Sequence, residues 1–141
     1  MIIKQLSIFL ENNSCRLVEV LSTLGEEKID IKAISIADTS EFGILRMLVS
    51  QPEEALQLLR KRGFSVNLTN VIAIATPVEA GSFAKALKIL SDKSISIEYL
   101  YAFSIGKKAA IIIRTEDIEK ATMTIRESSM ELLNATELNQ L

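Results

Sequence analysis

The chain has 141 residues and a formal net charge of −2, and its composition, with 48% hydrophobic and 24% charged residues, is typical of a globular protein. The slightly acidic balance argues against nucleic-acid binding, and no apolar stretch reaches the roughly 18 residues that a membrane span needs. The chain has no histidine and one cysteine, Cys15, which excludes His-based catalysis, His-ligated metals, an intrachain disulfide and a Cys-cluster zinc site.

The first half of the chain alternates between strand and helix patterns. Apolar and polar residues alternate over 3–10, which is typical of a half-buried strand and not of a signal peptide. Pro52 suits the first turn of a helix, and Gly63 suits a C-terminal helix cap. The elements predicted here are a strand over 3–10, a helix over 17–28, strands over 29–37 and 43–50 joined by a turn over 38–41, a helix over 52–63 and a strand over 64–68.

The second half repeats the same order of elements. We predict a strand over 71–76, a helix over 82–92, strands over 95–104 and 109–115, a helix over 117–127 and a strand over 130–133. Residues 71–75 and 109–113 are apolar at consecutive positions, and such strands are usually buried on both faces. We therefore expect the helix-free face of this sheet to be covered, most simply by a second copy of the chain in a homodimer.

The two halves are an internal repeat. The apolar stripe that starts at Leu17 recurs at Phe83, and Ile31 recurs at Ile97, so both pairs are offset by 66 positions (83 − 17 and 97 − 31). A constant offset indicates a duplicated folding unit, with domains over 1–69 and 70–141. The order βαββαβ in each domain predicts an α+β fold of two ferredoxin-like lobes, with antiparallel sheets and both helices on one face.

The loop after the first strand is the first candidate binding site. Unpaired N–H groups at a helix N-terminus can hold a carboxylate, and asparagine offers both donors and acceptors to a zwitterion. The alternative is simple helix capping by Asn13 or Ser14. Arg16 suits either a ligand carboxylate or solvent, and Cys15 is either a reactive thiol or a small apolar side chain. The candidates in this loop are Glu11, Asn12, Asn13, Ser14, Cys15, Arg16 and Leu17.

The duplicated βαββαβ order, this polar loop and the Arg-Leu pair at its end resemble a tandem ACT domain. ACT domains are amino-acid-sensing modules of aspartate kinases, phosphoglycerate dehydrogenases and acetolactate synthases. The segment 24–31 resembles the family's passage from helix to strand, and the segments 37–39, 42–46 and 98–103 resemble its small stand-alone tandem proteins in particular. The resemblance implies a non-catalytic protein without a cofactor.

The family's loop pattern is Asp or Asn, any residue, Pro, Gly, any residue, Leu. In the first lobe Asn12 and Leu17 match, while Ser14 and Cys15 replace the Pro and the Gly. In the second lobe Gly81 matches and Phe83 is apolar, but the positions of the Asp or Asn and of the Pro are occupied by Val78 and Ala80. We therefore expect ligand contact in the first lobe.

The resemblance also implies that the ligand lies where one lobe's loop meets the second strand of a neighbouring lobe. This adds two triplets to the candidate site, which are Ser35, Ile36 and Ala37, and Tyr99, Leu100 and Tyr101. For the tyrosines, packing at a sheet edge or a lobe interface remains the alternative.

The function predicted from the sequence is that of a cytoplasmic regulatory protein. It would bind a free amino acid between its lobes, form a homodimer, and report the ligand to a partner such as a metabolic enzyme acted on in trans. Nucleic-acid and membrane partners are not expected. The alternative is a structural or protein-interaction ACT pair that has lost ligand binding.

Overall fold

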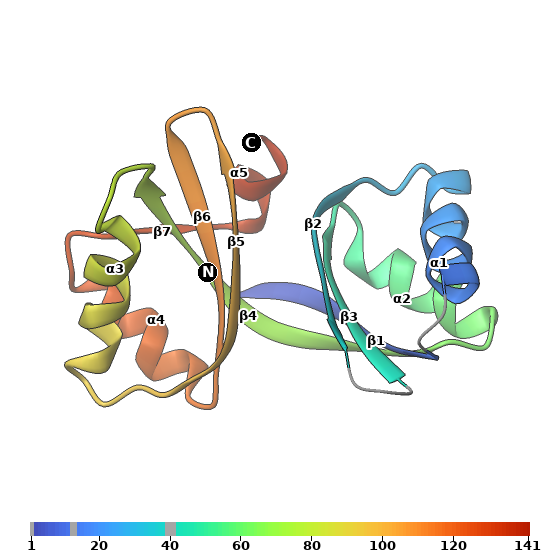
Figure 1. The fold of residues 1–141 in the computed structure, drawn as a ribbon, viewed down its shortest axis with the longest axis horizontal. Helices are drawn as coiled ribbons and strands as arrows, with labels where there is room; N and C mark the ends of the chain where they lie inside the picture. Colours follow the sequence, from blue (N-terminus) through green and yellow to red (C-terminus); the bar gives the residue numbers. More distant parts are fainter. Residues whose placement is uncertain (1, 12–13, 39–41) are drawn as a thin grey trace. The chain divides into compact units, whose positions relative to one another are not determined.

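The computed structural model describes residues 2–11, 14–38 and 42–141, and the chain divides into two compact units (Figure 1). The first unit is Lys4–Thr69, and the second is Asn70–Leu141 together with the residues that precede Lys4. Two strands, β1 and β4, cross this division.

The first unit has four antiparallel strands in the order β2-β3-β1-β4. Its elements are β1 (Ile3–Glu11), α1 (Ser14–Glu26), β2 (Ile31–Asp38), β3 (Phe42–Val49), α2 (Pro52–Lys61) and the first five residues of β4 (Ser65–Pro77). Both helices cover one face of the sheet (Figure 1). Alternate strand residues such as Leu6, Ile8 and Met47 enter the core beneath them with no exposed surface. Most of the predicted turn over 38–41 lies outside the described residues.

The second unit repeats this layout in the strand order β7-β4-β6-β5, which confirms the predicted fold class of ferredoxin-like lobes. Its elements are the rest of β4, α3 (Ser82–Ser91), β5 (Ile97–Ile105), β6 (Lys108–Thr115), α4 (Ile118–Arg126), β7 (Glu131–Leu133) and α5 (Ala135–Asn139). Helices α3 and α4 contact each other over the core formed by Ile72, Ile74 and Ile111. Among the described residues, no helix is both long and apolar enough to pass through a lipid bilayer.

The 66-residue offset extends to single hydrogen bonds. In the first unit the Ile29 amide donates to the Leu24 carbonyl over 3.0 Å, and in the second the Ile95 amide donates to the Leu90 carbonyl over the same 3.0 Å. Lys28 and Ser94, also 66 positions apart, both adopt a φ of +57° where α1 and α3 end. The two copies therefore share their helix ends as well as their apolar pattern.

The predicted strands over 64–68 and 71–76 are in fact one continuous strand, β4. No glycine or proline interrupts the chain between them, and the Arg114 guanidinium donates to the Asn70 carbonyl over 2.9 Å. The extended backbone therefore continues from one unit into the other.

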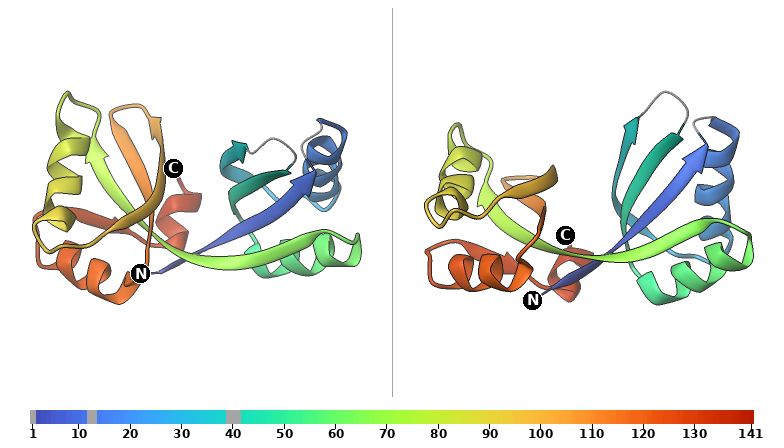
Figure 2. Two further views of the ribbon diagram at one scale, coloured as in Figure 1. Left: turned by 60° about the horizontal axis from the view of Figure 1, so that its bottom comes forward. Right: turned by 90° about the horizontal axis from the view of Figure 1, so that it is seen from below.

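The helix-free face of the second sheet is buried, as the continuous apolar strands predicted, but part of its cover was not predicted. Val71, Ala73 and Ile112 have no exposed surface. The short helix α5 lies on the opposite side of this sheet from α3 and α4, and its Leu138 is only 2% exposed (Figures 1 and 2). The face is buried along β4 and β6, while Ile105 on β5 is 52% exposed. The apolar strands β4 and β6 therefore no longer argue for a second copy.

Candidate functional site

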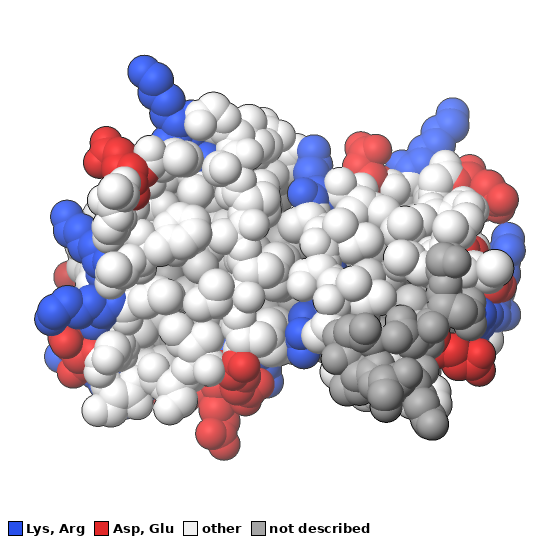
Figure 3. Space-filling model, viewed as in Figure 1, with Lys and Arg blue, Asp and Glu red and all other residues white. Residues whose placement is uncertain are grey.

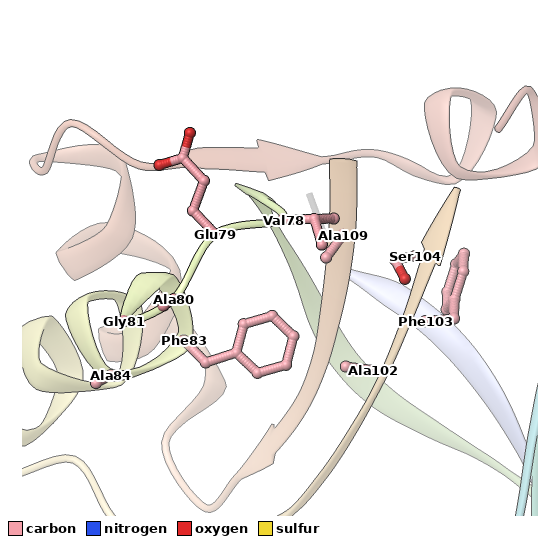
Figure 4. Close-up of a pocket in the computed structure, with 10 residues that line it drawn as sticks. All are labelled: Val78, Glu79, Ala80, Gly81, Phe83, Ala84, Ala102, Phe103, Ser104 and Ala109. Carbon is pink, nitrogen blue, oxygen red and sulfur yellow. The ribbon is translucent and has the colours of Figure 1, made fainter. Parts of the chain in front are cut away.

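A pocket of about 680 Å³ opens in the second unit where β4 turns into α3. We call it the α3 pocket (Figure 4). Three segments form it, namely the β4–α3 loop, the first turn of α3 and the facing part of β5 and β6. Its lining residues are Val78, Glu79, Ala80, Gly81, Phe83, Ala84, Ala102, Phe103, Ser104 and Ala109.

Local backbone structure fixes the loop side of the pocket. Gly81 is the N-cap of α3 and has a φ of +86°, a left-handed conformation that costs glycine little. The Val78 amide donates to the Lys107 carbonyl over 2.9 Å, which ties the loop to the β5–β6 turn. The Ser82 amide donates to the Glu79 carbonyl over 3.1 Å and closes the turn that leads into the helix.

The strand side comes from the outer strand, β5, and its neighbour, β6. Ser104 is paired with Ala109, and Ala102 is paired with Ile111, which belongs to the core under α3 and α4. Because directly opposed residues share a face, Ala102 and Ser104 point to the helix side of the sheet. Phe103 points to the other side in Figure 4, where it also lines a smaller cavity of about 190 Å³ next to α5.

The α3 pocket combines apolar walls with a helix N-terminus that no described side chain caps. By contrast, Asp117 caps α4 by accepting from the Lys120 amide over 3.1 Å. The side chains of Val78 and Phe83 remain 52% and 42% exposed, and the Phe83 ring points into the space between α3 and β6 (Figure 4). The first-turn amides that follow Ser82 favour an anionic group, and the exposed ring and methyl groups favour an apolar one.

Glu79 is the charged residue among those that line the α3 pocket. In Figure 3 the visible face of the second unit is largely uncharged, with basic and acidic side chains interspersed at its margins. This pattern differs from the continuous basic surface that nucleic acids require. Among the described residues, no group of three His, Cys, Asp or Glu side chains could hold a metal ion.

The predicted loop of the first unit is only partly described. Asn12 and Asn13 lie outside the described residues, and the side chain of Ser14 is not described either. Glu11 ends β1 and is exposed, and Cys15 is exposed in the first turn of α1.

Arg16 and Leu17 have partners within the first unit. The Arg16 guanidinium donates to Glu19 over 2.9 Å, and its central carbon lies 4.3 Å from the centroid of the Phe64 ring. Leu17 packs against the core of the first unit. These contacts account for both side chains without a ligand.

The two predicted strand triplets are each divided between the faces of their sheets. Ile36 is paired with the core residue Leu45 and so lies on the helix side, while Ser35 and Ala37 lie on the other face. In the second unit, Leu100 lies on the helix side and is 40% exposed. Tyr99 and Tyr101 lie on the opposite face.

Most of the residues that line the α3 pocket lie 66 positions after a residue of the predicted site, so they are its counterparts in the second unit. The offset maps the lining residues onto positions 12, 13, 14, 15, 17, 18, 36, 37, 38 and 43 of the first unit. All but three of these positions, 18, 38 and 43, were candidates. The repeat itself was therefore a signal for the α3 pocket, although the loop residues favoured the first unit.

The chain thus consists of two antiparallel βαββαβ units, the second of which has a pocket at its strand–helix loop. The sequence model of the ACT domain pair family matches residues 1–141, so the chain belongs to this family. The predicted resemblance is thereby confirmed. A comparison with curated proteins gave no match.

Solved structures share the fold over most of the chain. A Bacteroides thetaiotaomicron protein whose name states no activity is 42% identical, with a TM-score of 0.96 over 100% of this chain and 98% of that one. The ligand-free regulatory subunit of aspartate kinase from Thermus thermophilus is 16% identical, with a TM-score of 0.65 over 89% of this chain and 91% of that one. The corresponding Thermus flavus subunit is 17% identical, with a TM-score of 0.59 over 89% and 92%. At these identities, the two Thermus structures support the fold alone.

Proposed function

We propose that this chain is a non-catalytic regulatory protein that binds a free amino acid in the α3 pocket. The observation that carries the proposal is the pairing, in one pocket, of an uncapped helix N-terminus with exposed apolar side chains. The ligand carboxylate would bind the first-turn amides of α3, and its side chain would pack on Phe83 and Val78.

Membership of the ACT domain pair family supports this proposal, since the solved fold relatives include proteins named as regulatory subunits of aspartate kinase. By analogy, we propose that this chain acts in trans by reporting ligand occupancy to a metabolic enzyme. Ligand binding would stabilise one arrangement of the β4–α3 loop, and the partner would recognise that arrangement.

The first test is a thermal scan with the twenty common amino acids at millimolar concentration. A ligand at 100 times its dissociation constant adds about 2.7 kcal/mol to the free energy of unfolding. For a chain of this size, that stabilisation raises the melting temperature by several degrees. We expect at least one amino acid to do so, whereas flat melting temperatures throughout would leave the structural alternative.

The second test locates the site by filling the pocket. Ala102 is exposed on β5 and lines the α3 pocket, so Ala102→Phe should occupy the ligand's volume and lower affinity at least tenfold. The matched control is Ile36→Phe, because Ile36 is the counterpart of Ala102 in the first unit and is 47% exposed. Calorimetric titration compares the two variants. If Ile36→Phe blocks binding and Ala102→Phe does not, the ligand binds at the first unit's loop instead.

The alternative function is a structural or protein-interaction pair without a ligand. The loop sequences favour it, since Cys15 replaces the family's glycine in the first unit and Val78 replaces its polar residue in the second. Under this alternative, the α3 pocket would be an apolar surface without a ligand, and amino acids would not raise the melting temperature of the protein. The thermal scan separates the two functions.

A further inference from the structure

Two buried threonine hydroxyls in the second unit have no hydrogen-bond partner among the residues that the structure describes. They belong to Thr76 on β4, which is 2% exposed, and Thr115 on β6, which has no exposed surface. An unpaired buried hydroxyl costs stability, because it loses its bonds to water and gains none in return. Such a group therefore requires an explanation.

Thr76 lies next to a wall residue of the α3 pocket, on the neighbouring strand. It is paired with Ala109 across the β4–β6 ladder, and Ala109 is part of the pocket wall. Directly opposed residues of an antiparallel pair share a face, and their Cβ atoms lie about 4.5–5.5 Å apart. The Thr76 side chain is thus on the helix side of the sheet, about one side-chain length from the wall. Thr115 is paired with Ile97, near the other end of the sheet.

The internal repeat shows what is unusual about this position. The counterpart of Thr76 in the first unit is Leu10, which is 2% exposed and belongs to the core. Replacing leucine by threonine at the end of the strand shortens the side chain and adds a hydroxyl. The first unit therefore fills this space with hydrocarbon, while the second leaves a polar group next to its pocket.

The side chain of Phe83 occupies part of the α3 pocket in front of β6. Its ring points from α3 toward β6 across the pocket, and the residue is 42% exposed (Figure 4). Rotamers of exposed side chains interchange on the picosecond to nanosecond timescale, so a ligand entering the pocket can displace the ring. A group that takes the place of the ring would then lie against Ala109, whose neighbour on the same face of the sheet is Thr76.

We propose that Thr76 is a specificity-determining residue of the α3 pocket and that its ligands are amino acids with a hydroxyl group on the side chain. This inference rests on the proposed amino-acid binding. A hydroxyl can pair with the Thr76 hydroxyl as donor or acceptor. A charged side chain would lose its hydration for one neutral partner, and an apolar side chain would leave Thr76 unpaired.

The test compares two pairs of isosteric amino acids, L-threonine with L-valine and L-tyrosine with L-phenylalanine. For the wild-type chain, we expect calorimetric titration to give a roughly three- to tenfold higher affinity for the hydroxylated member of at least one pair. Thr76→Val keeps the shape and removes the hydroxyl, so the preference should vanish. Thr76→Ser keeps the hydroxyl, so the preference should survive.

Thr115→Val is the matched control, because it removes the other unpaired hydroxyl far from the pocket. Both valine variants should be at least as stable as the wild type without ligand, and only Thr76→Val should change the affinity ratio. An unchanged ratio in Thr76→Val, or no preference in the wild type, would overturn this inference while amino-acid binding itself stands. If no amino acid binds the wild type, the proposed function fails, and this inference fails with it.

Discussion

At the scale of single residues, Gly81 is the position where backbone conformation shapes the site. Its φ of +86° is unfavourable for residues with a Cβ, although an added Cβ would meet no atom within 4 Å. Gly81→Ala should therefore lower the free energy of unfolding by roughly 1–2 kcal/mol through backbone strain alone. Chemical denaturation measures this loss.

The control for that prediction is Gly25→Ala in α1. An added Cβ there also meets no atom within 4 Å, and Gly25 does not have a left-handed φ. Alanine is a better helix former than glycine by up to about 1 kcal/mol, so this variant should be as stable as the wild type or more so. Equal destabilisation by both substitutions would show that conformation at Gly81 is not the cause.

At the scale of secondary-structure elements, α5 depends on its capping box. The Glu137 amide donates to the Asn134 side chain over 2.8 Å, and the Asn134 amide donates to the Glu137 carboxylate over 3.3 Å. Asn134→Ala removes the first of these bonds and should cost about 1 kcal/mol of local stability. Hydrogen exchange at the Leu138 amide, which donates to the Asn134 carbonyl, should become several-fold faster.

Thr136→Ala is the control for α5, since Thr136 is exposed in the same helix and lies outside the capping box. It should leave exchange at Leu138 nearly unchanged. If Asn134→Ala also leaves that exchange unchanged, packing of Leu138 holds α5 in place and the cap does not.

At the scale of the whole molecule, we still expect a homodimer with an interface above roughly 1,000 Å². The argument now rests on the first unit, where Phe9 and Phe42 are 58% and 48% exposed on neighbouring strands. Phe9→Glu should shift sedimentation at micromolar concentration from dimer to monomer, because a charge on an apolar interface is costly to bury. Val18→Glu is the control, since Val18 is equally exposed at 58% but lies on α1. A monomeric wild type would contradict the prediction.

The repeat made the fold predictable from the sequence, because the same order of helix and strand patterns occurs twice and each copy supports the assignment of the other. The stripes at Leu17 and Phe83 alone are ambiguous, but their common offset fixes which helix corresponds to which. The short helix α5 was missed because five residues are too few for a periodic pattern. Its signal was the spacing of Asn134 and Glu137, which is that of a capping box.

The candidate site was harder to predict, because a pocket depends on the space that side chains leave. Loop chemistry favoured the first unit, where Asn12 offers hydrogen bonds. Two of the differences in the second unit are Gly81, where the first unit has Cys15, and Thr76, where it has Leu10. Each of them changes the pattern of apolar residues by one position at most. Their effect on the pocket depends on packing around α3, which the pattern does not contain.

The continuity of β4 has a consequence for the history of the chain. Duplicated domains are usually joined by an exposed linker, which lets each copy be lost, cut or exchanged on its own. Here the boundary between the copies falls inside β4, a hydrogen-bonded strand that takes part in the sheets of both units. A cut at the boundary between the copies would divide β4. It would damage either the edge strand of the first unit or the first strand of the second. Separating the two copies therefore requires a cut through a strand that both units use.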